Sequence, residues 1–180
     1  MKVRTVMTKD VRVVNAKSSL AVAGETMAEF GCGVLPVVDA QSKVIGILTD
    51  RDVCVTLARR NQLASQIPVY RAMSTDVVFC GPDDDIQMAL RTMRSQQVRR
   101  LPVLGDDGAL VGILSMDDVV VNATSWAGNV CPEVTPGEAV VTLRAIYGSR
   151  SARIPPVPPV SAPPRNGLRS MSNLHHFRPC

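Results

Sequence analysis

The order of hydrophobic and polar positions is the same twice along residues 1–126. Short apolar runs at 11–14 and 77–80 are typical of β-strands. Each is followed by a stretch whose apolar residues fall on one face of a helix, namely Leu20, Ala23, Met27 and Phe30, and then Ile86, Ala89, Leu90 and Met93. Two further apolar runs and a second helix complete each half. The pattern therefore predicts strand, helix, strand, strand, helix, repeated once.

The two halves are copies of one another in sequence as well as in pattern. Residues 6–53 align without a gap on residues 72–119, and 14 of the 48 pairs are identical. A gapless internal repeat indicates a duplicated supersecondary unit, and two copies imply a pseudo-twofold arrangement. The seam between two related halves is a natural place for small-molecule clefts.

Local signals mark where the helices begin. Short oxygen side chains at residues 18–19 and 83–85 can accept hydrogen bonds from the first helical N–H groups, so a helix is predicted after each. The closing helix of each repeat is expected to begin at Asp52 and at Asp118.

Two β-hairpins are predicted between these helices. Residues 34–38 are apolar, and so are residues 101–104 after Arg100; polar turns join these runs to residues 44–48 and 110–114. The first run of each pair contains a proline, which has no N–H donor for a sheet ladder. This predicts that the proline-containing runs are edge strands or strand starts.

Composition narrows the class of protein. Apolar residues make up 46% of the chain but aromatic residues only 3%, so the core is expected to be aliphatic. No apolar run approaches the roughly 18–20 residues that span a bilayer, and the first residues lack a secretory pattern. The five cysteines form neither a disulfide framework nor a zinc motif, because their number is odd and their spacing wide. We expect a cytoplasmic protein without membrane contact.

The net charge of +4 for the whole chain arises from its C-terminal region. Residues 144–180 hold six arginines and no carboxylate, whereas residues 1–143 carry 14 basic and 16 acidic groups, a net charge of −2. This argues against a nucleic-acid-binding body. Residues 135–138 are a plausible helix start, and the proline-rich sequence from residue 149 is expected to be a disordered tail.

One motif could carry binding chemistry. Residues 46–52 and 112–118 both read Gly-apolar-apolar-Thr/Ser-x-x-Asp at the junction of a predicted strand and helix. The hydroxyl and the carboxylate can converge, a carboxylate can accept hydrogen bonds from two vicinal ribose hydroxyls, and a helix N-terminus suits a phosphate. The alternative is that these residues are ordinary helix caps.

Three features carry a resemblance to a known family: this motif, the duplicated apolar-Pro-Val strand and the capped helix between strands. On these features, residues 1–125 resemble a tandem pair of cystathionine β-synthase-type (CBS) domains, the Bateman module. The resemblance implies an α+β fold in which two repeats, each a small three-stranded sheet with flanking helices, pack with pseudo-twofold symmetry. Stand-alone pairs resemble bacterial and archaeal stress or regulatory proteins, often dimeric, that bind adenosine compounds between the repeats. The implied organisation is CBS repeat 1 at 1–66, CBS repeat 2 at 67–126, a short helical extension at 127–148 and the Pro/Arg-rich tail at 149–180.

The resemblance also assigns candidate site residues. It places Thr49 with Asp52, and Ser115 with Asp118, on the ribose side of two sites. The implied apolar walls near an adenine are Val13, Leu35, Pro36, Phe79, Leu101 and Pro102, for which the alternative is plain core packing.

The two copies differ where a phosphate would lie. Arg51 precedes Asp52, whereas the second copy has Asp117 there, and a carboxylate opposes a phosphate that an arginine can bind. Arg99 and Arg100 could converge with Arg51 on a shared phosphate region, or all three could be solvated surface groups. Our hypothesis is that the Thr49/Asp52 site is competent and that the Ser115/Asp118 site is weaker or empty.

We expect a non-enzyme, because the only histidines lie in the tail and the sequence shows neither a Gly-rich phosphate loop nor a metal cage. The predicted function is a regulatory module that senses AMP, ADP or ATP, requires no cofactor, and signals to an unknown protein partner by a change of conformation or of homodimer packing. The alternatives are a constitutive dimer or interaction module with empty clefts, and a thiol redox switch.

Overall fold

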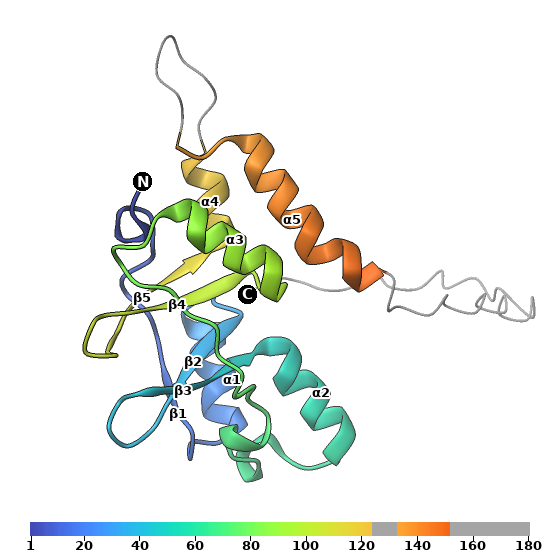
Figure 1. Ribbon diagram of the computed structural model, residues 1–180. Coiled ribbons are helices and arrows are strands. Elements are labelled where there is room, and N and C mark those ends of the chain that lie inside the picture. Colours follow the sequence, from blue (N-terminus) through green and yellow to red (C-terminus); the bar gives the residue numbers. More distant parts are fainter. Residues whose placement is uncertain (124–132, 152–180) are drawn as a thin grey trace, which may run out of the picture.

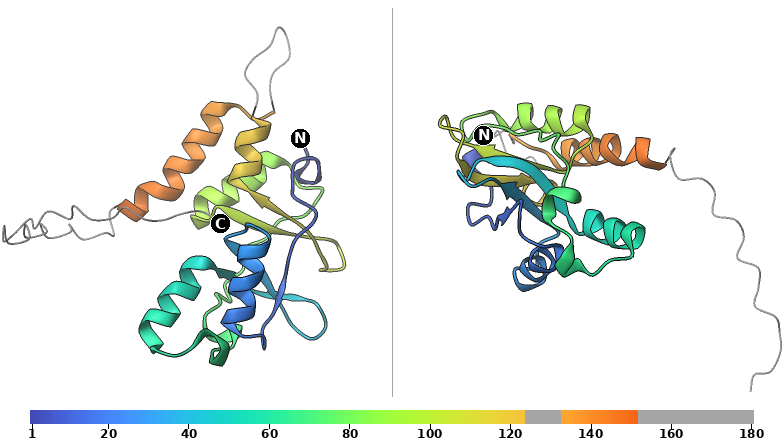
Figure 2. Two further views of the ribbon diagram at one scale, coloured as in Figure 1. Left: turned by 180° about the vertical axis from the view of Figure 1, so that it is seen from behind. Right: turned by 90° about the horizontal axis from the view of Figure 1, so that it is seen from below.

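The computed structural model describes residues 1–123 and 133–151. The fold is mixed α+β, as predicted, and its small sheets lie between α1 and α2 on one side and α3, α4 and α5 on the other (Figures 1 and 2). The elements in chain order are η1 (Val3–Thr5), β1 (Val14–Asn15), α1 (Leu20–Glu29), β2 (Val34–Val38), β3 (Val44–Thr49), α2 (Asp50–Arg60), η2 (Ala64–Gln66), η3 (Val69–Arg71), α3 (Ile86–Gln96), β4 (Arg100–Leu104), β5 (Leu110–Ser115), α4 (Met116–Asn122) and α5 (Pro136–Ser151).

The first helix of each repeat begins where the sequence predicts. The hydroxyl of Ser19 accepts a hydrogen bond from the N–H of Val22 at 3.3 Å, and the carboxylate of Asp85 accepts one from Gln87 at 2.8 Å. The predicted start of the closing helices is wrong by two residues. Helix α2 begins at Asp50 and α4 at Met116, because the preceding hydroxyl residue, not the aspartate, is the N-cap.

Both predicted hairpins are confirmed, but one predicted edge strand is wrong. Strand β2 pairs antiparallel with β3, and β4 pairs antiparallel with β5. Strand β2 is the middle strand of the order β1-β2-β3. Pro36 is tolerated there because β1 pairs only with Val37 and Val38, so no neighbouring strand requires the missing N–H. In the second sheet, a single parallel bridge between Cys80 and Val103 replaces the third strand.

The opening segment of each repeat, which precedes its first helix, packs on the other repeat. Ser74 forms a bridge with Ile47 of β3, and Thr8 forms the equivalent bridge with Ile113 of β5. Each bridge consists of two backbone hydrogen bonds of 2.9–3.0 Å. Strand β3 is therefore extended by a segment of the second repeat, and β5 by a segment of the first.

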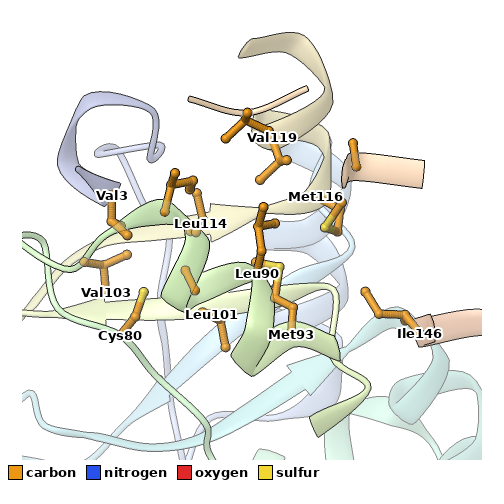
Figure 3. Close-up of a cluster of buried hydrophobic side chains, with 14 residues drawn as sticks. Val3, Cys80, Leu90, Met93, Leu101, Val103, Leu114, Met116, Val119 and Ile146 are labelled. Atoms are coloured by element: carbon orange, nitrogen blue, oxygen red, sulfur yellow. The ribbon is translucent and has the colours of Figure 1, made fainter. Parts of the chain in front are cut away.

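The protein has two separate hydrophobic cores among the described residues. One contains Ile67 and Val69 together with the side chains of repeat 1. The other contains Val3 of η1 with Leu90, Leu114 and their neighbours (Figure 3). The buried apolar side chains among the described residues are aliphatic or sulfur-containing, as the low aromatic content predicts.

Helix α5 covers only the second core. It lies along α3 and α4 (Figure 1), and Ala139 and Ile146 are buried in that cluster. Thr135 and Glu138 form a capping box at its start, and Gln87 of α3 donates to the carboxylate of Glu138 at 3.0 Å. The hydrogen bond from the Thr135 backbone is the main reason that the pKa of Glu138 is lowered. The first turn of α5 is thus fixed to α3.

The helical extension reaches further than the predicted residue 148, because α5 continues to Ser151. The rest of the predicted tail, residues 152–180, lies outside the described residues. None of the described helices combines the length and apolar character that a membrane span requires.

Candidate functional site

Thr49 and Asp52 form a capping box at the start of α2. Asp52 Oδ2 accepts hydrogen bonds from the Thr49 hydroxyl at 2.6 Å and from the Thr49 N–H at 3.0 Å, and the N–H of Asp52 returns one to the hydroxyl at 3.2 Å. The capping role that the sequence left open is therefore present. It uses one carboxylate oxygen, and no described residue donates a hydrogen bond to Asp52 Oδ1.

Ser115 and Asp118 repeat this geometry at the start of α4, with one difference. Asp118 Oδ2 accepts from the Ser115 hydroxyl at 2.6 Å and from the Ser115 N–H at 2.7 Å. Its other oxygen, Oδ1, accepts a hydrogen bond from the hydroxyl of Thr8 at 3.2 Å. Among the described residues, Asp52 therefore keeps one carboxylate oxygen without a donor, whereas both oxygens of Asp118 accept hydrogen bonds.

Each capping box lies in a cleft of its own. The cleft at Thr49 has a volume of about 200 Å³. Its lining residues are Val34, Ile47, Thr49, Asp52, Ser74, Asp76, Val78, Val98, Arg99, Arg100 and Pro102. The cleft at Ser115 has a volume of about 350 Å³. Its lining residues are Thr8, Asp10, Val11, Arg12, Phe30, Gly31, Cys32, Gly33, Val34, Arg100, Ile113, Ser115, Asp117 and Asp118. We call these the Thr49 cleft and the Ser115 cleft.

Residues of both repeats line each cleft, because the opening segment of each repeat packs on the other repeat. In the Thr49 cleft, the capping box of repeat 1 faces Ser74 and Asp76 from the segment before repeat 2. In the Ser115 cleft, the capping box of repeat 2 faces Thr8 and Asp10. The two sites are therefore related by the internal repeat.

The charges of the two clefts differ. The Thr49 cleft is lined by two arginines, Arg99 and Arg100, and by the two carboxylates Asp52 and Asp76. The Ser115 cleft is lined by two arginines and three carboxylates, namely Arg12, Arg100, Asp10, Asp117 and Asp118. An anionic ligand is therefore opposed less in the Thr49 cleft.

Pairing within the Ser115 cleft increases this difference. The guanidinium of Arg12 lies 3.3 Å from the carboxylate of Asp10 and 4.1 Å from the ring centroid of Phe30. Arg100, which lines both clefts, approaches Asp117 at 3.8 Å. Arg12 is therefore engaged within this cleft, whereas the Arg100–Asp117 contact affects both clefts and does not distinguish them.

The predicted phosphate-side arginines do not all come together. Arg99 and Arg100 line the Thr49 cleft, as the sequence suggested they could. Arg51 is exposed in the first turn of α2 and lines neither cleft. Arg51 therefore does not share a cleft with Arg99 and Arg100.

Most of the predicted adenine walls lie elsewhere. Pro102 lines the Thr49 cleft, whereas Pro36 is buried outside both clefts. Leu35 and Leu101 are fully buried in the two cores. Val13 and Phe79 are 42% and 57% exposed and line neither cleft. These five residues line neither cleft, and their contact with an adenine stays a prediction.

The residues that sequence reasoning missed come from the exchanged segments. Thr8 and Ser74 are a like pair in the repeat, and Asp10 and Asp76 are an identical pair. All four line the clefts at equivalent positions. The sequence does contain a signal for these residues: they are polar, they lie outside the predicted strands, and they are alike in the two copies of the repeat.

The cysteines within the described residues have different environments. Cys32 lines the Ser115 cleft and Cys54 is exposed. Cys80 is buried, and burial, followed by the charge of Asp84, raises its pKa to about 12. Among the described residues, no group of three or more His, Cys, Asp or Glu side chains could hold a metal ion.

Comparison with known proteins identifies the family. The CBS domain family matches twice, at residues 3–59 and 64–123, so the chain belongs to the CBS domain family and contains two of these domains. The CBS domain-containing protein YhcV of Bacillus subtilis is 34% identical over 123 residues, which are 68% of this chain and 86% of YhcV.

Solved structures share the fold. The CBS-domain-containing protein ATU1752 of Agrobacterium tumefaciens is 30% identical with a TM-score of 0.61, covering 67% of this chain and 98% of its own. CBSX2, whose crystal structure contains AMP, is 26% identical with a TM-score of 0.58, covering 67% of this chain and 93% of its own. CBS pair proteins are regulatory, and some of them bind adenosine ligands.

Proposed function

We propose that this protein is a regulatory module that binds an adenine nucleotide of the AMP, ADP or ATP class in its Thr49 cleft. The observation that carries the proposal is the meeting, in one cleft, of the open Asp52 carboxylate oxygen with the side chains of Arg99 and Arg100. A carboxylate oxygen suits ribose hydroxyls, and guanidinium groups suit a phosphate. That CBSX2, a member of the same family, holds AMP supports this choice of ligand.

The size and the charge of the clefts favour different sites. The Ser115 cleft is the larger, at about 350 Å³ against 200 Å³. For a phosphorylated ligand we give charge more weight, because an uncompensated carboxylate close to a phosphate opposes binding whatever the space. The larger cleft, with its extra carboxylate, would favour an adenosine compound without phosphate, and AMP would bind there weakly or not at all.

Regulation requires that the nucleotide bind one conformation better than another. We propose that this difference reaches a protein partner, or the packing of a homodimer, in the cytoplasm, and that the protein has no catalytic role. A ligand could have this effect because the Thr49 cleft and the Ser115 cleft are each formed by both repeats, so a bound ligand would bridge the repeats.

A thermal-shift panel of AMP, ADP, ATP and adenosine with the full chain tests the proposal. A ligand that binds only the folded state raises the unfolding midpoint as its concentration rises. We expect at least one phosphorylated ligand to raise the midpoint more than adenosine does. An unchanged midpoint with all four compounds would reject nucleotide binding and favour an interaction module with empty clefts.

A further inference from the structure

Arg99 connects the Thr49 cleft to helix α5. Its side chain lines the cleft and also a small cavity of about 40 Å³ that Leu143 and Tyr147 of α5 help to enclose. Arg99 Nη1 donates a hydrogen bond to the Tyr147 hydroxyl at 2.8 Å. The guanidinium carbon lies 5.8 Å from the centroid of the Tyr147 ring. Arg99 is thus a residue of the cleft whose guanidinium contacts the helix.

Helix α5 holds Tyr147 in a fixed place. The neighbouring residue Ile146 is fully buried in the second core, and Thr142, one turn earlier, is also fully buried. The Thr142 hydroxyl donates to the carbonyl of Glu138 at 2.8 Å, so it has a partner within the helix. The phenol that meets Arg99 is therefore anchored by the packing of α5 on α3 and α4.

We propose that Tyr147 is a positioning residue that holds Arg99 for the phosphate of a nucleotide in the Thr49 cleft, and that α5 responds to occupancy of this cleft. The inference rests on the proposed function. A guanidinium has five N–H donors, and the hydrogen bond to Tyr147 uses one of them, so the others can bind a phosphate at the same time. Holding the group in place beforehand lowers the entropic cost of binding. Binding is reciprocal, so a phosphate on Arg99 must stabilise the docked helix in turn.

The arrangement is specific to one cleft. The repeat places Gly33 at the position equivalent to Arg99, and Gly33 lines the Ser115 cleft without a side chain. Helix α5 packs on α3 and α4 of the second repeat. Among the described residues, the Ser115 cleft has no such hydrogen bond from a lining arginine to α5. The Arg99–Tyr147 hydrogen bond would therefore connect α5 to the Thr49 cleft, although Arg100 and Asp117 of the Ser115 cleft also line the small cavity beside α5.

Tyr147→Phe tests the positioning role, because it removes the hydroxyl and keeps the ring. Calorimetric titration should show AMP affinity falling about three- to tenfold, which is less than for a lost hydrogen bond to a charged group of the ligand, because Tyr147 acts only through Arg99. Adenosine, which has no phosphate, should bind equally well to the variant and the wild type. In an Arg99→Gln background, Tyr147→Phe should have no further effect, because the coupling would already be lost.

Hydrogen exchange of the α5 amides tests the response of the helix. AMP should slow exchange in α5 of the wild type, adenosine should not, and Tyr147→Phe should reduce the effect. Three results would overturn the inference while the proposed function stands. Tyr147→Phe could weaken AMP and adenosine binding equally, or its effect could add to that of Arg99→Gln. The third is that Tyr147→Phe does not weaken AMP binding and AMP does not slow exchange in α5. If the wild type binds no AMP at all, the proposed function fails and the inference fails with it.

Discussion

The sulfur of Met73 lies 2.6 Å from the position that a β-carbon on Gly46 would occupy. Met7 stands in the same relation to Gly112, also at 2.6 Å. Because glycine has no side chain, the opening segment of the second repeat can approach β3 closely enough to pair with it, and that of the first repeat can approach β5. The identity of Gly46 and Gly112 in the repeat is thus explained by the close packing of these segments, which also line both clefts.

Replacing either glycine by alanine should loosen this exchange. A β-carbon at Gly46 would lie 3.0 Å from the backbone oxygen of Ser74, and one at Gly112 would lie 2.9 Å from that of Thr8. We expect each variant to lose about 1–3 kcal/mol of unfolding free energy, typical of overpacking, with Gly112→Ala at least as costly. Urea denaturation measures the loss.

Gly24→Ala is the matched control for these variants. Gly24 lies inside α1, and a β-carbon there meets nothing within 4 Å. This change should stabilise the protein by up to about 1 kcal/mol, because alanine is the better helix former. Neutral effects of both Gly46→Ala and Gly112→Ala would show that the segments do not pack closely on the strands.

The capping box of α5 should make stability depend on pH. The pKa of Glu138 is lowered in the folded state from an ordinary 4.5, so its contribution is present above that value and is lost as pH falls through the lower, folded-state pKa. Glu138→Gln should lower stability at neutral pH and reduce the loss on acidification. Urea denaturation at neutral pH and below the ordinary pKa measures both.

Glu25→Gln is the control for this variant, because Glu25 is an exposed carboxylate on α1. Its effect on stability at neutral pH should be smaller than that of Glu138→Gln, because no hydrogen bond of a capping box is lost. If Glu138→Gln has the same pH profile as the wild type, the capping box at Thr135 does not contribute to the docking of α5.

The cysteines should differ in reactivity. Cys54 is exposed, whereas Cys80 is buried with its pKa raised to about 12, and the thiolate is the reactive form. A thiol-specific reagent followed by peptide mapping should modify Cys54 quickly and Cys80 only after unfolding. Modification of Cys80 in the folded protein at the rate of Cys54 would contradict its burial and would favour the redox-switch alternative.

The elements that depend on local signals were predictable. Ser19 and Asp85 cap their helices as expected, and both hairpins follow the apolar runs. The partners of the segments before the repeats were not predictable, since the Thr8–Ile113 bridge joins residues far apart in the chain and no local pattern specifies it.

The candidate site was predicted in part for the same reason. The two capping boxes are a local motif, and their geometry is as the spacing implies. The predicted walls do not follow the clefts, because only Val14 of the predicted strand 11–14 lies in β1, and only Cys80 of its counterpart 77–80 forms a bridge. Residues that the strand pattern placed beside a ligand, such as Val13 and Phe79, are exposed instead.

Calorimetric titration of AMP into Asp52→Asn and Asp118→Asn tests the central claim most directly. The two variants are matched, because each removes one charge from an equivalent capping box and keeps an amide oxygen as an acceptor. We predict that Asp52→Asn weakens AMP binding about 10- to 100-fold, the range for a lost hydrogen bond to a charged acceptor, and that Asp118→Asn changes it little. Unchanged affinity in Asp52→Asn, or an equal loss in Asp118→Asn, would contradict the claim that the Thr49 cleft is the nucleotide site.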